Sequence, residues 1–366
     1  MVIGAAGGVG RDVINYLSTT PGVAKIVAAD VNEEAGRKVA DDAARSASYL
    51  GYFTNVEFRK CDLFDIPGTT ELLREVKPVV VLQATTLGSW WTSHLLPEAL
   101  VKKASPLGMW LPNHLALPVK LMKAVKQSGI DTKVVNCSFP DAVNVILGKL
   151  GMAPVCGGGN FDLICGIIHH RVSQSLGVPT RDVKVFGVGD HSHYTSAMAK
   201  PWWIKILAGD RDVTSRFDAR ELIKGSNFYT GPVHFDAPPK EQTYTSAAYT
   251  KNVLSIYFDD GRIHSCIPGP NGLPGGYPTR LNAKGAEVVM PEGITLEEAK
   301  KINEVSRRND GIETIRDDGT VIYIRKVAED FKDVLGYECY ELKINELDER
   351  ARELNSLMKK ALSKYK

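Results

Sequence analysis

The chain has 366 residues, of which 43% are hydrophobic and 24% charged, and its 45 basic and 43 acidic side chains leave a net charge of +2 at pH 7. This length suffices for two or three globular domains with sizeable cores. The near balance of charge argues against nucleic acid or an anionic membrane as a partner. No stretch reaches the roughly 18 apolar residues of a membrane helix, and the start lacks the basic flank and apolar core of a signal peptide, so we expect a cytoplasmic protein.

Residues 1–150 alternate short apolar runs with helix-length segments. Such alternation predicts βαβ units in a parallel sheet, because each crossover has to return over a face of the sheet. We therefore predict an α/β fold for this half, a Rossmann-type doubly wound parallel sheet. One predicted helix of this half starts at about Asp12, and the others cover 33–50, 70–76 and about 113–128. The last predicted strand is K-V-V-N at 133–136.

Residues 151–366 differ from the first half in having paired β-like segments. The segment 252–267 predicts a hairpin that turns at Asp260-Gly261. The stretch from Glu346 to about Ser363 is charged and carries leucines near helical spacing, which predicts an amphipathic helix docked by one face. We predict an α+β substrate and catalytic domain that ends in this helix.

A glycine-rich loop, G-A-A-G-G-V-G at residues 4–10, lies between an apolar start and a predicted helix. Glycines in such a place let the backbone turn tightly and approach a pyrophosphate, whose charge the amides of the helix N-terminus stabilise. Only three residues precede the loop, whereas a strand usually has about five, so we expect a short first strand or a start that lacks residues. The predicted cofactor-binding residues of the loop are Gly4, Gly7, Gly8, Val9 and Gly10.

The ends of the next strands supply further candidates for cofactor binding. Asp30 ends the second predicted strand, where a carboxylate can hydrogen-bond a ribose hydroxyl. It favours NAD over NADP, because a 2′-phosphate would meet a negative charge, although Arg37 could soften that preference. Asp62 either flanks the adenine or is a solvated aspartate at a strand end. Ala84 and Asn136 end later strands and complete the predicted set.

Four segments resemble the malate and lactate dehydrogenases. The glycine loop with D-V-N-E-E-A-G-R-K-V-A-D-D resembles the family's opening, and L-G-V-P-T-R-D-V-K-V-F-G-V-G-D-H resembles the segment that ends in its catalytic Gly-Glu-His-Gly motif. Y-T-S-A-A resembles a substrate-pocket strand, and R-L-N-A-K-G-A-E-V-V-M-P-E-G-I-T resembles a late hairpin. The likeness touches most of residues 1–300 in patches, and the last sixty or so match poorly. The resemblance implies an NAD-dependent oxidoreductase that acts on a small-molecule substrate. It also implies that the protein assembles as a dimer or tetramer.

The resemblance makes His191 the acid–base residue, which exchanges the alcohol proton as hydride moves to or from the nicotinamide. Histidine suits this role because its ordinary pKa of about 6.5 lies close to operating pH. Asp190 replaces the family's glutamate, and Ser192 and His193 replace a glycine and an acid. We therefore expect the mouth of the site to differ from the family's.

The family's orienting aspartate and its carboxylate-clamping arginine fall at Ile164 and Ile167, which can do neither. Asp162 lies two residues before the expected aspartate, so we expect it to orient His191 after a small shift of the helix start. Arg171 is the only nearby arginine. It either contacts the substrate or is a solvated arginine on a helix face, and the second interpretation is favoured.

The loop T-T-L-G-S-W-W-T-S-H-L-L-P-E at 85–98 lacks the arginine that the family uses to read its substrate. Trp90, Trp91 and His94 either line a larger, less acidic pocket or, for the tryptophans, pack at a subunit interface. Thr245 touches the substrate by the resemblance, and Ser138 or Asn136 takes the place of the family's asparagine. These departures predict a substrate other than malate or lactate, namely a larger hydroxy acid, a sugar acid or a sugar derivative.

Two alternatives stay open. The related NAD- and manganese-dependent glycosidases use a cysteine that Cys156 resembles, so Cys156 and His191 could hold a divalent ion. The other alternative is a non-catalytic NAD-binding sensor or structural subunit, because fold does not dictate function. Six cysteines without C-x-x-C pairs favour reduced thiols over a disulfide framework or a structural zinc site, and we expect most of them to be core residues.

Overall fold

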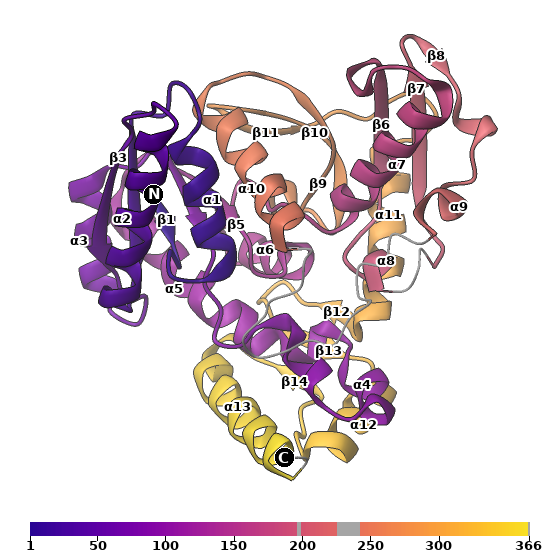
Figure 1. Ribbon diagram of the computed structural model, residues 1–366. Helices are drawn as coiled ribbons and strands as arrows, with labels where there is room; N and C mark the ends of the chain where they lie inside the picture. The colour runs from indigo at the N-terminus through magenta and orange to yellow at the C-terminus, as the bar shows by residue number, and fades with distance from the viewer. Residues whose placement is uncertain (196–198, 225–241, 365–366) are drawn as a thin grey trace.

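Figure 1 shows the chain as a computed structural model, which describes residues 1–195, 199–224 and 242–364. The side chains of Trp90, Tyr194 and Thr195 also lie outside the described part. Within it, no helix is long and apolar enough to cross a membrane.

A five-stranded parallel sheet forms the first half of the chain, as predicted. The strands lie side by side in the order β3-β2-β1-β4-β5. The chain adds β2 and β3 on one side of β1 and then crosses over to add β4 and β5 on the other side. β1 has only two residues, yet it pairs with β2 on one side and with β4 on the other. The strands are β1 (Val2–Ile3), β2 (Lys25–Asp30), β3 (Asn55–Lys60), β4 (Val80–Gln83) and β5 (Lys133–Asn136).

Helices connect these strands and cover the sheet (Figure 1). Three of them begin earlier than the sequence predicted, because their first turns contain glycine or proline, which the prediction treated as loop. Proline is tolerated there, since the first amides of a helix have no partner within it. The crossover helices are α1 (Gly8–Ser18), α2 (Glu33–Tyr49), α3 (Ile66–Val76) and α5 (Leu111–Ser128), and a further segment after β4 contains η1 (Trp90–Leu95) and α4 (Glu98–Ala104).

The described part of the second half contains three antiparallel sheets, in agreement with the predicted α+β character, and two of them come before the C-terminal segment. The strand β6 (Val183–Val188) pairs with β7 (Trp203–Ala208), and β8 (Arg211–Asp212) completes that sheet. The other sheet has the order β11-β10-β9 and contains the late hairpin that the resemblance implied. Its strands are β9 (Ile263–Pro268), β10 (Gly276–Asn282) and β11 (Gly285–Val288), and the helices around these sheets are α6 (Pro140–Lys149), α7 (Phe161–Leu176), α8 (Ser192–Thr195), α9 (Ala219–Ile223) and α11 (Leu296–Ser306).

The predicted hairpin at 252–267 is wrong in its first half, which belongs to helix α10 (Gln242–Tyr257). Tyr249, Val253 and Ile256 recur every three or four residues and are buried where α10 packs against α1 and the parallel sheet. This tertiary burial overrides the local preference of the β-branched residues for a strand. For the same reason, the strand predicted around Thr245 is also helical.

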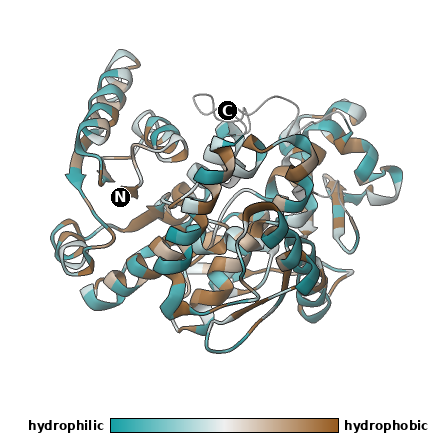
Figure 2. Ribbon diagram, turned by 90° about the horizontal axis from the view of Figure 1, so that it is seen from below, coloured by the Kyte–Doolittle hydropathy of each residue, from teal (hydrophilic) through white to brown (hydrophobic). Residues whose placement is uncertain are grey.

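The C-terminal segment packs onto the first half of the chain and shares its largest hydrophobic core. α13 (Leu347–Ser363) is the predicted amphipathic helix. It lies against α5 and buries Leu347, Leu354 and Met358 on one face. Figure 2 shows hydrophobic residues on the strands and on the inward faces of helices, with hydrophilic residues outside. The rest of this segment is the sheet β12 (Ile312–Ile315), β13 (Val321–Tyr323) and β14 (Glu341–Leu342) with helix α12 (Arg325–Leu335).

Candidate functional site

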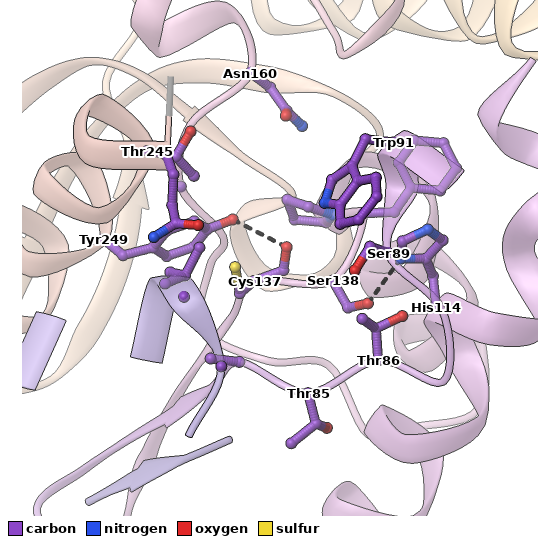
Figure 3. Close-up of a pocket in the computed structure, with 18 of the residues that line it drawn as sticks. Thr85, Thr86, Ser89, Trp91, His114, Cys137, Ser138, Asn160, Thr245 and Tyr249 are labelled. Atoms are coloured by element: carbon purple, nitrogen blue, oxygen red, sulfur yellow. Dashed lines mark hydrogen bonds between the residues drawn. The ribbon is translucent and has the colours of Figure 1, made fainter. Parts of the chain in front are cut away.

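A cavity of about 580 Å³ opens at the carboxyl ends of β1 and β4. The strand order reverses there, and ligands of doubly wound sheets bind at such a switch point. The glycine loop, the segments after β4 and β5, helix α10 and His191 all contribute to its lining. Figure 3 shows that Thr245 and Tyr249 of α10 lie on one side of this space, with Trp91 and His114 on the other.

The glycine loop is packed too closely for larger residues at two positions. Gly4 has a φ of +91°, and a Cβ there would lie 2.5 Å from the Ala84 carbonyl oxygen. A Cβ on Gly10 would lie 2.1 Å from the Gly4 carbonyl oxygen. Gly7, Gly8 and Val9 line the cavity at the start of α1, where the first amides of the helix lack partners within it. This cradle fits a pyrophosphate.

The other predicted cofactor residues divide between the cavity and its supports. Ala84 lines the cavity. Asp30 accepts hydrogen bonds from the amides of Ala6 and Asn32, both at 2.9 Å, so it holds the glycine loop. Asp62 is exposed and lies outside the described lining.

Asn136 is almost fully buried and also lies outside the lining. Its side-chain oxygen accepts from the Ser138 amide at 3.0 Å, and its amide group donates to the Asn144 side-chain oxygen at 2.8 Å. Asn136 therefore shapes the turn after β5, and the neighbouring Cys137 and Ser138 are the residues that face the cavity.

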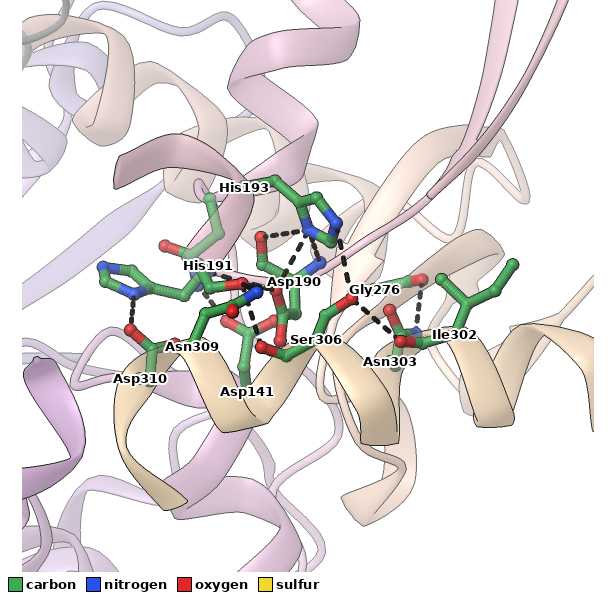
Figure 4. Close-up of polar contacts among 12 residues, drawn as sticks. Asp141, Asp190, His191, His193, Gly276, Ile302, Asn303, Ser306, Asn309 and Asp310 are labelled. Carbon is green, nitrogen blue, oxygen red and sulfur yellow. Dashed lines mark hydrogen bonds and ion pairs between the residues drawn. The ribbon is translucent and has the colours of Figure 1, made fainter. Parts of the chain in front are cut away.

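His191 lies in the cavity lining directly after β6, and Asp310 holds it in place. The Nδ1 atom of His191 is 3.0 Å from the Asp310 Oδ1 atom, and both side chains are largely buried (Figure 4). A carboxylate only accepts hydrogen bonds when ionised, so Nδ1 carries the proton and Nε2 is left for a ligand. This arrangement is the histidine–carboxylate pair that acid–base catalysis uses.

Asp162 does not make the predicted contact with His191. It is buried at the start of α7, and its carboxylate oxygen is 2.5 Å from the Lys251 Nζ atom on α10. The helix start did not shift toward His191, because this ion pair holds Asp162 between α7 and α10. The partner of His191 comes instead from the turn after α11, 119 residues farther along the chain.

The surroundings of His191 are acidic and dry. Burial alone would lower the pKa of His191, but the Asp310 carboxylate holds that pKa above its ordinary value. Burial raises the pKa of Asp310, and His191 counters part of this effect. Burial and the charge of Asp190 raise the pKa of Asp141 to about 7. The histidine therefore sits among carboxylates whose charged forms are expensive to bury.

Ser192 and His193 do not alter the mouth of the site, contrary to expectation, because both side chains are buried. The His193 Nδ1 atom is 3.0 Å from an Asp190 carboxylate oxygen, and its Nε2 atom is 2.8 Å from the Pro201 carbonyl oxygen. The Ser192 hydroxyl donates to Asp190 at 2.7 Å. These contacts stiffen the turn that carries His191.

The predicted substrate residues are not all in the cavity. Trp91 and Thr245 line it, whereas the Trp90 side chain lies outside the described residues and His94 is not part of the described lining. Arg171 is also outside the lining, and its guanidinium donates to the Lys224 carbonyl oxygen at 2.8 Å.

The metal site suggested by Cys156 is not supported. Cys156 is fully buried in the apolar core beneath the sheet and does not line the cavity with His191. Burial raises the pKa of its thiol to about 12, which disfavours the thiolate that a metal needs. Among the described residues, no group of three or more His, Cys, Asp and Glu side chains is placed to hold a metal ion.

Sequence reasoning missed Asp310, His114 and Asp141. His114 lines the cavity from the first turn of α5, and Asp141 is buried in the first turn of α6. No local motif marks Asp310, because its role depends on the packing of α11 beside β6. The weak signal for His114 was a lone histidine in the first turn of a predicted helix, next to the apolar run Leu115–Leu117.

Solved structures of malate and lactate dehydrogenases resemble this chain. Malate dehydrogenase from Plasmodium falciparum in complex with NADH has a TM-score of 0.57 at 15% identity, with 98% of each chain covered. Lactate dehydrogenase from Cryptosporidium parvum, complexed with lactic acid and nicotinamide adenine dinucleotide, has a TM-score of 0.58 at 18% identity, with 84% of this chain and 94% of that chain covered. No model of a known protein family matches the sequence, and neither does any curated protein. The chain therefore has the fold of the malate and lactate dehydrogenases.

Proposed function

We propose that this protein is an NAD-dependent oxidoreductase, a divergent member of the malate and lactate dehydrogenase superfamily. It transfers hydride between nicotinamide and a hydroxyl or carbonyl carbon of a small polar substrate other than malate or lactate. The observation that carries the proposal is that His191, paired with Asp310, lines the same cavity as the glycine loop. Two solved structures of similar fold support it, because they are complexes with NADH and with NAD.

The chain's residues divide the work between binding and proton transfer. Gly7, Gly8 and Val9 would hold the cofactor's phosphates at the start of α1. A bound NAD would supply the hydride acceptor for the carbinol carbon. The hydroxyl proton passes to the Nε2 atom of His191 as that carbon becomes a carbonyl. Asp310 fixes the tautomer of His191 and stabilises the imidazolium that results.

The experiment that tests this function is the change in nicotinamide absorbance when the protein and NAD meet a panel of hydroxy acids, sugar acids and sugars. The panel is run once with a chelator and once with added manganese. We expect metal-independent reduction of NAD by at least one compound, and poor rates with lactate and malate. NAD binding without any turnover would favour the sensor or structural subunit. A requirement for manganese would favour the metal-dependent, glycosidase-like alternative.

Cytoplasmic location and homo-oligomerisation stay predictions. The mass of the purified protein by light scattering, at several concentrations, would test the second. A concentration-independent mass near 40.0 kDa, that of one chain, would contradict it.

A further inference from the structure

His114 lines the cavity and carries a buried polar atom that has no hydrogen-bond partner among the described residues. Its side chain is 5% exposed, and its Nδ1 atom is 3.0 Å from the Ser138 hydroxyl (Figure 3). Its Nε2 atom is buried and has no hydrogen-bond partner among the described residues. A buried polar atom without a partner is costly, so proteins keep one where a ligand or an ordered water completes it.

His114 belongs to the same wall of the cavity as His191. The ring of Phe139 lies between them, with ring centroids 6.3 Å from His114 and 5.2 Å from His191, both in edge-to-face geometry. Burial lowers the pKa of His114 to about 3, and the nearby His191 adds to this effect. The His114 ring is therefore neutral at pH 7, and its Nε2 atom can donate or accept according to the tautomer.

The charges around the cavity oppose an anionic substrate. Arg11 is the only arginine or lysine in the described lining, and it lies on α1 at the cofactor end with its guanidinium 3.4 Å from an Asp12 carboxylate oxygen. Around His191, the buried acidic groups are Asp141, Asp190 and Asp310. A carboxylate brought there would meet these three acids, and His191 is the one described lining residue at this end that could carry an offsetting positive charge.

The remaining lining of this region is uncharged, and it combines polar groups with the apolar residues Leu107, Phe139, Pro140 and Leu163. Thr86, Ser89, Ser138 and Asn160 supply hydroxyl and amide groups, and Trp91 supplies an aromatic surface (Figure 3). Hydroxyl groups of a ligand can both donate to and accept from such groups, whereas a carboxylate only accepts. The lining therefore suits a ligand with several hydroxyl groups and no charge.

Resting on the proposed function, we propose that the substrate is an uncharged polyhydroxy compound, a sugar or polyol, and that the Nε2 atom of His114 binds one of its hydroxyl groups. Oxidation of such a substrate would follow the step described above. The hydride of the carbinol carbon would go to NAD, and the hydroxyl proton would go to His191. His114 touches the substrate without exchanging that proton.

Matched pairs of compounds test the substrate class. Each pair shares a carbon skeleton and differs in one end, for example D-glucose with D-gluconate and glycerol with glycerate. We expect kcat/KM for NAD reduction to be at least about tenfold higher for the neutral member, and an equal or higher value for the acids would overturn the proposal. If neither member is oxidised, the hydride-transfer function fails, and calorimetric binding to the NAD complex then decides the substrate class, with preference for the acids or no binding of either member overturning it.

Two variants of His114 test its contact. His114→Asn keeps an amide near the Nδ1 position, next to Ser138, but removes the group at Nε2, whereas His114→Gln carries an amide toward the Nε2 position. We expect His114→Asn to raise KM for the neutral substrate about threefold to tenfold, the loss of one hydrogen bond, and His114→Gln to recover part of it. NAD affinity and circular dichroism are the controls for folding. Unchanged KM in a folded His114→Asn variant would overturn the assignment.

Discussion

The two ends of the cavity are built in different ways. At the cofactor end, Gly4, Gly7, Gly10 and Asp30 all come from the first 30 residues and pack largely within that segment, with Gly4 also close to the Ala84 carbonyl. At the His191 end, the contact that holds the histidine joins residues that are 119 positions apart. The comparison teaches that the cofactor end is a local motif, whereas the proton-transfer end is a product of long-range packing.

The largest expected effect separates the two ends directly. His191→Asn removes the proton acceptor, and general acid–base catalysis contributes about 10²–10⁴ in rate. We expect kcat to fall about a thousandfold while the Kd for NAD stays within a few fold, because the glycine loop is untouched. Steady-state kinetics and NAD titration measure both quantities. Activity that survives the change would remove His191 from the mechanism.

The second prediction concerns the buried charge at the His191 end. Asp141 has a pKa of about 7 in the fold against an ordinary value of 3.8. Between these pH values the Asp141 carboxyl is ionised in the unfolded chain but protonated in the folded protein. The free energy of unfolding therefore falls as pH rises, and the loss is complete above pH 7. This difference of about three pKa units corresponds to roughly 4 kcal/mol.

Asp141→Asn should remove this slope and stabilise the protein at pH 8, because a neutral amide replaces the carboxylate and can still accept the hydrogen bond from Asn160. Urea unfolding at pH 4, 6 and 8 measures the difference. Asp131→Asn, which changes an exposed surface aspartate, is the matched control. If wild type and Asp141→Asn show the same slope, Asp141 is not the buried acid responsible.

The third prediction tests the long-range partner against the local one that the sequence suggested. Asp310→Asn removes the charge that raises the pKa of His191, so the rate of alcohol oxidation should begin to rise at lower pH. Its maximum should fall about a hundredfold, because the imidazolium loses its counter-charge. The pH profile of kcat/KM records both changes.

Asp162→Asn is the matched control for Asp310→Asn, since Asp162 pairs with Lys251 and not with His191. We expect it to lower stability while leaving the midpoint of the pH profile in place. A shifted midpoint in Asp162→Asn, with an unchanged one in Asp310→Asn, would restore the partner that the sequence suggested.

The smallest effect belongs to the cofactor end. In Gly10→Ala, a methyl group would lie 2.1 Å from the Gly4 carbonyl oxygen, so we expect a loss of about 1–3 kcal/mol in unfolding free energy and weaker NAD binding. Gly166→Ala is the control, because a Cβ there meets no atom within 4 Å and alanine favours a helix. Chemical denaturation and NAD titration compare them. Equal stability of the two variants would show that the loop tolerates a side chain.

Prediction from the sequence worked where the signal was periodic and local. The parallel sheet and helix α13 follow from spacing that the structure keeps, and the late hairpin that the family resemblance implied is also present. It failed at α10, where β-branched residues favour a strand but burial between α1 and the sheet imposes a helix. It also failed at Asp162, which was expected to orient His191 because it lies close to the family's orienting position in the sequence. In the structure, Asp162 pairs with Lys251 instead.

The sequence by itself determined the glycine loop, the order of strands and helices in the first half, and the position of His191 after a strand. These follow from backbone sterics and from hydrophobic periodicity, both of which act over a few residues. Only the tertiary structure decided that Asp310 holds His191 and that His114 faces the cavity. The physical reason is that a hydrogen bond between distant residues depends on how α11 and α5 pack, and no local pattern in the chain encodes that packing.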